Sequence, residues 1–331
     1  MTSIYLALTQ GTGFADVHSM VKDHANTHPL RLLLSYWYFK DANLDELVAL
    51  FKGRPLDLFA DSGAYSAFTA GGKVSVEDYA AWVCRWHKYF TVVSAPDVIG
   101  DAKQSLLDTE KMLKLVPSSV TVLPVFHVGE DWSALQTCCD LSPYIALGGM
   151  VPHSHTLHLR GWLTQCFAKI PRAHRVHGFG MTNLNLLRAY PWASADSSSW
   201  TAGFRYGIFS LYDPKRRTIF TVHVNKPASL LRAASVLRYY GASASTLSDR
   251  AQMISLCVRS WQAIEDSLDK RVYLVALPRR VGSAVPNSLP ALARVGATPA
   301  APHIFLGIAG STSNASAPSQ SKALGDADEV P

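Results

Sequence analysis

The sequence predicts an α/β protein: a single (β/α)8 TIM barrel with an appended hairpin, C-terminal helices and a disordered C-terminal tail. Short apolar runs rich in β-branched residues alternate with amphipathic stretches, a pattern typical of parallel strands joined by helices. There are eight such runs, and eight strands close a barrel. Polar and glycine residues follow nearly every run, which favours a barrel mouth over the single switch point of a doubly wound open sheet.

The individual elements follow from local patterns. Strands are expected at residues 4–8, 32–39, 56–60, 91–95, 120–126, 144–147, 175–178 and 192–195. Helices are expected at residues 43–51, 75–83, 101–116 and 156–170. Ser75 should cap the second of these helices, because it directly precedes the apolar period and Asp78 falls in the first turn.

The pattern changes after Trp200. Residues 206–210 and 220–224 alternate in polarity, and Asp213-Pro214 between them is typical of a turn, so we expect a hairpin. Its tip would carry three basic residues, Lys215, Arg216 and Arg217. Two helices should follow, at 227–240 and 247–268. These elements predict one structured unit over residues 1–275. Residues 281–331 are rich in Ala, Pro, Ser and Gly with few charges, which predicts a disordered tail.

Composition narrows the class of protein. No apolar run approaches the roughly 18 residues that span a bilayer, and the first residues lack the basic region of a signal peptide, so we expect a cytoplasmic protein without a membrane partner. The five cysteines are scattered without a CxxC pair, which argues against a disulfide framework and a structural zinc site. The formal net charge of +6 suits a nucleic-acid partner, although many enzymes are equally basic.

The polar residues at the predicted strand ends suggest where the chemistry lies. The third strand leads into a run from Asp61 to Tyr65, and the eighth leads into Asp196. The intervening strands end in further candidates: Asp97, His127, Gly148, Gly149, Met150 and His177. In a barrel, the carboxyl ends of all strands meet around one mouth, so these residues should share one site.

These runs resemble the motifs of a known family. Asp61-Ser62-Gly63-Ala64-Tyr65, Gly148-Gly149 and Asp196 are similar, in the same order, to motifs of the tRNA-guanine transglycosylases. The stretches 176–181 and 194–200 resemble more closely the phage and genomic-island branch of that superfamily, whose members exchange guanine in DNA for a 7-deazaguanine. The resemblance covers residues 1–210.

The resemblance implies a pentosyltransferase that works through a covalent intermediate. Breaking an N-glycosidic bond develops positive charge at C1′, which one carboxylate can capture while a second carboxyl moves protons on the base. By resemblance, Asp196 is the nucleophile and Asp61 the proton-transfer residue. The base would be held by Ser62, Gly63, Tyr65 as a stacking face, Asp97 as a hydrogen-bond partner, His127, the backbone of Gly148 and Gly149, Met150 and His177.

The resemblance also implies the partners. These are DNA, with the three basic residues of the hairpin tip on its phosphates, and a 7-deazaguanine base such as preQ0 or a derivative. We expect no metal and no other cofactor, because the CxCxxC…H zinc site of the tRNA enzymes is missing and Cys257 is the only cysteine beyond Asp196. If the protein is phage-encoded, it would act in the host cytoplasm.

Three alternative functions stay open at this point. The same exchange could act on tRNA, as in a queuine or preQ1-type tRNA-guanine transglycosylase. A non-catalytic nucleic-acid-binding barrel could keep the shape of the pocket, and a metal-independent nucleosidase could use water in place of the incoming base. The individual residues have structural readings too, since Asp61 and Asp196 could cap local turns and the hairpin tip could be a solvated turn.

Overall fold

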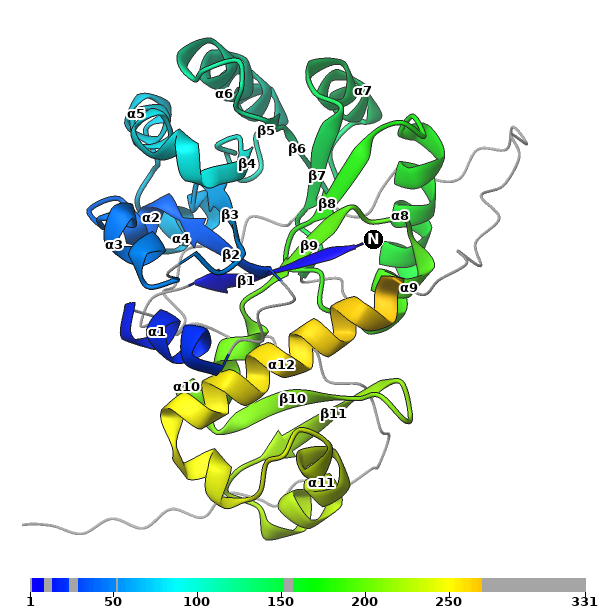
Figure 1. Ribbon diagram of the computed structural model, residues 1–331. Helices are drawn as coiled ribbons and strands as arrows, with labels where there is room; N and C mark the ends of the chain where they lie inside the picture. Colours follow the sequence, from blue (N-terminus) through cyan, green and yellow to red (C-terminus); the bar gives the residue numbers. More distant parts are fainter. Residues whose placement is uncertain (1, 9–13, 24–28, 52, 152–156, 270–331) are drawn as a thin grey trace, which may run out of the picture.

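The computed structural model describes residues 2–8, 14–23, 29–51, 53–151 and 157–269. Its main feature is a parallel sheet with helices around the outside (Figure 1). The strands are β1 (Ser3–Leu8), β2 (Leu30–Ser35), β3 (Leu56–Asp61), β4 (Phe90–Ser94), β5 (Val122–Leu123), β6 (Val125–His127), β7 (Tyr144–Gly148), β8 (Arg175–Gly178) and β9 (Ser194–Ser197). Along the sheet their order is β5-β4-β3-β2-β1-β9-β8-β7-β6.

The sheet closes because its two end strands are consecutive parts of one segment. β5 and β6 are separated only by Pro124, which lacks the N–H that a continuous ladder needs. On one side of the segment, Ala95 N donates to Leu123 O at 2.8 Å, and on the other Ala146 N donates to Pro124 O at 2.8 Å. Residues 122–127 therefore join β4 to β7, and the predicted (β/α)8 barrel is confirmed, with its fifth strand divided at the proline.

The four helices predicted before the hairpin are present, with small changes at their ends, and the described part of the chain adds six that the sequence analysis did not predict. Before the hairpin the helices are α1 (Phe14–Asp23), α2 (Tyr36–Phe39), α3 (Leu44–Ala49), α4 (Ala64–Thr69), α5 (Val76–Trp86), α6 (Ala102–Leu115), α7 (Trp132–Leu141), α8 (Leu157–Lys169), α9 (Leu184–Ala189) and α10 (Ala202–Tyr206), with 3-10 turns η1 (His87–Tyr89) and η3 (Ser199–Thr201). The predicted four are α3, α5, α6 and α8. Ser75 caps α5 as predicted, and its side chain accepts a hydrogen bond from Asp78 N at 3.2 Å.

Two predicted strands have the wrong bounds. The strand expected at 32–39 ends at Ser35, and the aromatic residues that follow form the helical turn α2. Tertiary packing overrides their β propensity, because the Tyr36 ring lies against Tyr79 and Trp82 of α5. The last strand begins at Ser194 rather than at Trp192, whose ring packs against Phe167 on the outer side of the barrel.

The hairpin is an insertion before the last barrel helix. β10 (Ile208–Asp213) and β11 (Thr218–His223) pair antiparallel, as predicted, and α11 (Pro227–Tyr239), η4 (Ser245–Ser248) and α12 (Arg250–Asp269) follow. Near the start of α12, Arg250 Nε pairs with Asp16 Oδ1 at 2.9 Å, and near its end Glu265 Oε2 accepts from Ile4 N at 2.9 Å. α12 therefore runs antiparallel to β1, in the position of the eighth barrel helix, and lies between the barrel and the hairpin (Figure 1).

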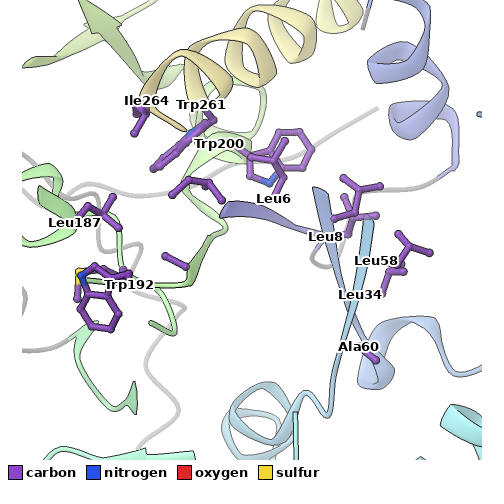
Figure 2. Packing of buried hydrophobic residues seen from close by; sticks show 14 of the residues in the cluster. Leu6, Leu8, Leu34, Leu58, Ala60, Leu187, Trp192, Trp200, Trp261 and Ile264 are labelled. Carbon is purple, nitrogen blue, oxygen red and sulfur yellow. The ribbon is translucent and has the colours of Figure 1, made fainter. Parts of the chain in front are cut away.

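The buried side chains form two layers on either side of the strands. The inner layer fills the barrel with Tyr5, Ala7, Leu33, Phe59, Val92, Leu123, Val125, Tyr144 and Ala146. The outer layer packs strand residues such as Leu6 and Leu58 among the helices, together with Trp192, Trp200 and Trp261 (Figure 2). Strand residues two apart share a face, so the period of two decides which side chains enter the barrel.

Two predicted features lie outside the described residues: the tail at 281–331 and the end of the structured unit at residue 275. Within the described part of the chain, no helix combines the length and apolar character that crossing a membrane requires.

Candidate active site

The side chains of the site lie on the inner face of the barrel, each two residues after an inward-facing strand residue. Phe59 is buried in the inner layer, so Asp61, two residues later on β3, points to the same face at the carboxyl end of the strand. The same step carries four polar side chains to this end of the interior: Asp61, Ser94, His127 and Asp196. The fold therefore gathers, at one mouth, residues that lie up to 135 positions apart in the chain.

Asp61 has surroundings that oppose its ionisation. Its Oδ2 accepts a hydrogen bond from Gly63 N at 3.0 Å, and its Oδ1 accepts one from Ser94 Oγ at 3.2 Å. Burial, followed by the charges of Asp97 and Asp196, raises the pKa of Asp61 to about 7 in spite of these two hydrogen bonds. The carboxyl is thus present in both acidic and basic forms at neutral pH, which suits a group that transfers protons. Because the charges of Asp97 and Asp196 act on Asp61, the three carboxyl groups belong to one site.

The turn after Asp61 holds the carboxyl in place. Ser62 is buried, and its N–H donates to Ser94 Oγ at 3.2 Å while its own Oγ accepts from Ala64 N at 3.2 Å. Gly63 has φ of +75°, and a Cβ there would lie 2.3 Å from Ser35 Oγ, so only glycine fits. Tyr65 follows in the first turn of α4 with 68% of its surface exposed, so it stands in solvent rather than inside the barrel.

His127 lies between two carboxylates. Its Nε2 is 2.9 Å from Asp97 Oδ2, and its Nδ1 is 3.0 Å from Glu130 Oε1. Burial alone would lower the pKa of His127, but the hydrogen bonds to Asp97 and Glu130 and the charges of both raise it to about 10. His127 is therefore an imidazolium at neutral pH, and both of its ring nitrogens donate.

The predicted glycine pair shapes the wall next to His127. A Cβ on Gly148 would lie 2.7 Å from Cδ2 and 2.9 Å from Nε2 of His127, so the glycine lets the imidazole lie directly against β7. Gly149 has φ of +69° and turns the chain out of the strand. Met150 is only 1% exposed, which makes it part of the packing beneath this turn.

Asp196 is held on one of its two oxygens. Gly180 N donates to Asp196 Oδ1 at 2.8 Å, and His177 Nε2 lies 3.3 Å from the same oxygen. His177 is fully buried and enclosed by the rings of Tyr5, Phe59 and Phe179. It therefore lies beneath the carboxylate, whereas the sequence suggested a place on the surface of the pocket.

The basic residues of the hairpin tip lie apart from this mouth. At the start of β10, Phe209 and Met253 of α12 both pack around Gly203, and further along Tyr212 N donates to Ser260 Oγ at 2.8 Å. β10 therefore runs in the same direction as α12. The end of α12 lies beside the beginning of β1, where Glu265 accepts from Ile4 N, and this is the end of the barrel opposite the mouth. Beside the tip is a hollow of 270 Å³, lined by Asp213, Lys215, Arg216, Ser235, Val236, Arg238 and Tyr239.

The site contains residues that the sequence analysis did not single out. They are Ser94, Glu130, Tyr144, Gly180 and Ser194. Glu130 was detectable in principle, since it follows His127 by three residues at a strand end, but the others contribute through contacts between distant strands. No group of three or more His, Cys, Asp or Glu that could hold a metal ion occurs among the described residues.

Comparisons with known proteins bear on the fold alone. No protein-family model matches the sequence. The search of curated proteins likewise gives no match. Among solved structures, the chain is similar to the crystal structure of a protein assigned as a fructose-1,6-biphosphate aldolase from Coccidioides immitis. The TM-score is 0.51 at 9% sequence identity, over 81% of this chain and 92% of the other. This likeness supports the barrel architecture and leaves the chemistry to be argued from the site.

Proposed function

We propose that this protein is a pentosyltransferase that replaces guanine in DNA with a 7-deazaguanine through a covalent aspartyl intermediate. The observation that carries the chemistry is the set of coupled carboxyls at the barrel mouth, in which Asp61 has a pKa of about 7 and Asp196 is held by a backbone N–H. Two carboxyl groups in different environments can divide the roles of nucleophile and proton carrier. The resemblance of the strand-end motifs to the transglycosylases supports the choice of substrate.

The proposed exchange is a double displacement at C1′ of the target deoxyribose. An Asp196 oxygen attacks C1′, the bond from C1′ to N9 of guanine breaks, and the leaving base takes the bonding electron pair and a proton from Asp61. The incoming 7-deazaguanine then loses its N9 proton to the Asp61 carboxylate, and its N9 displaces Asp196 from C1′. The protons and charges balance over the cycle, and the configuration at C1′ is retained.

Recognition of the base would use the neighbouring carboxylate and imidazolium. Guanine offers N–H donors at N1 and N2 and an acceptor at O6. Asp97 uses Oδ2 to bind His127, which leaves Oδ1 to accept from the N–H groups of the base edge. His127 on β6 is held by Glu130 in the turn that follows, and it fixes Asp97 in the loop after β4, so Asp97 is held in place before the base arrives. Tyr65 on the rim would stack on the extruded nucleotide.

The test is an exchange assay with a labelled 7-deazaguanine on duplex DNA and on unmodified tRNA at the same salt concentration. We expect label in DNA, together with a protein–DNA adduct that survives denaturation. Greater incorporation into tRNA would favour the tRNA alternative. Release of free guanine without incorporation would indicate a nucleosidase, and binding with neither release nor incorporation would indicate a non-catalytic barrel.

A further inference from the structure

A chain of buried polar groups leads through the barrel interior to Asp196. Tyr144 Oη lies 2.6 Å from Ser194 Oγ, and Ser194 Oγ lies 2.5 Å from His177 Nδ1. The opposite nitrogen, His177 Nε2, faces Asp196 Oδ1 at 3.3 Å. All three residues of the chain are buried, with Ser194 and His177 completely so. Polar groups placed this deep need partners, because an unpaired buried donor or acceptor is costly.

The direction of the hydrogen bonds follows from their partners. Burial raises the pKa of Tyr144, so it is a protonated phenol that can donate to Ser194. Ser194 has one proton, which it then gives to His177 Nδ1. A neutral imidazole that accepts at Nδ1 carries its own proton on Nε2. The described residues offer Nε2 no hydrogen bond of normal geometry, and the polar atom that it faces is the Asp196 carboxylate.

We propose that His177 is a positioning residue that holds Asp196 Oδ1 and so leaves Oδ2 as the oxygen that attacks C1′. Gly180 N donates to Oδ1 and His177 Nε2 lies 3.3 Å from the same oxygen, whereas Oδ2 accepts no hydrogen bond from the described residues. A contact of 3.3 Å is long, and contacts of this kind shorten when substrate binds. This inference rests on the proposed function for the attack step, but the state of His177 can be measured without it.

The ring nitrogens of His177 give a test that needs no substrate. In protein labelled with 15N-histidine, NMR should show the proton on Nε2 and none on Nδ1, with the signal assigned by its loss in His177→Gln. Ser194→Ala removes the group that fixes this tautomer, so Nε2–H should lose its dominance in that variant. A His177 with a bare Nε2 in the wild-type protein would overturn the proposal.

The role in the reaction is tested by the rate of adduct formation. His177→Leu keeps the bulk of the side chain but removes the donor, so the rate of covalent adduct formation should fall about 10- to 100-fold while nucleic-acid binding is unchanged. His177→Gln, whose amide reaches a similar distance, should recover most of that loss. The urea midpoints of both variants report whether the fold is intact.

The outcomes separate this inference from the proposed function. A wild-type rate in folded His177→Leu overturns the positioning role, and so does an equal loss in the Leu and Gln variants. If the wild-type protein forms no adduct with DNA or tRNA, the proposed function fails. The NMR result then decides alone whether His177 donates to Asp196.

Discussion

The raised pKa of Asp61 predicts that removing its charge stabilises the protein at high pH. We consider Asp61→Asn, which keeps the shape of the side chain and stays neutral. Raising the pKa from 3.8 to about 7 corresponds to roughly 4 kcal/mol, since each tenfold change in proton affinity is worth about 1.4 kcal/mol. The penalty arises because burial and the charges of Asp97 and Asp196 disfavour the ionised form.

The sign of the effect sets the pH window. Below about pH 4 the carboxyl is protonated in the folded and the unfolded chain, so the substitution should change the free energy of unfolding little. Between about pH 4 and pH 7 the unfolded chain loses this proton while the folded chain keeps it, so wild-type stability falls as the pH rises. Above pH 7 the folded protein carries the full penalty, which the asparagine avoids.

Urea unfolding at several pH values measures this difference. Asp61→Asn should be more stable than wild type by up to roughly 4 kcal/mol at pH 8, with the gap closing toward pH 4. Exchange should nevertheless fall by about two or more orders of magnitude, the usual contribution of a general acid–base group. Asp140→Asn, on the exposed face of α7, serves as the control and should show no such trend. A stability difference independent of pH would refute the reasoning for Asp61.

Three further changes test other parts of the site. Asp196→Ala should abolish the denaturation-resistant adduct and leave the circular dichroism spectrum and melting temperature near wild type. A variant that still forms the adduct would exclude Asp196 as the nucleophile. Gly148→Ala should displace His127 and raise KM for the base about tenfold or more, whereas Gly161→Ala, where a Cβ meets only open space, should not. Alanine at all three basic residues of the hairpin tip should leave the log–log salt slope of DNA binding near wild type, because the tip lies at the end of the barrel opposite the mouth. A slope lowered by about one per substituted residue would show that DNA phosphates reach the tip.

The sequence was sufficient for the barrel and for the strand ends that form the mouth. Its apolar runs have the length and spacing of parallel strands, and the carboxyl ends of such strands must meet on one side of a barrel. This reasoning brings Asp61, Asp97 and Asp196 together without a structure. It does not supply the layer beneath them, because Ser194 and Tyr144 are 50 residues apart and meet only when their strands share the interior.

The direction in which the hairpin runs and the way individual side chains face were harder to predict from the sequence. The alternation of polarity indicates the hairpin and its basic tip, but only the packing of Tyr212 against Ser260 decides that β10 runs away from the mouth. His177 is a similar case, since its place at a strand end does not tell whether it faces the pocket or the interior. For Tyr65, the helix α4 begins at Ala64, one residue before the tyrosine, and directs its ring into solvent.

A site built from mutually repelling carboxyls needs strands that are fixed by other contacts. β9, which carries Asp196, lies between two buried indoles (Figure 2). Trp192 Nε1 donates to Leu186 O at 3.1 Å before the strand, and Trp200 Nε1 donates to Ala7 O at 3.0 Å after it. Each indole combines a large buried surface with a satisfied hydrogen bond, so the backbone on both sides of Asp196 is held by packing outside the mouth. Displacing a reacting group by about 1 Å can cost a hundredfold in rate. The two indoles therefore fix where the Asp196 side chain lies, and they do so through packing and hydrogen bonds outside the mouth.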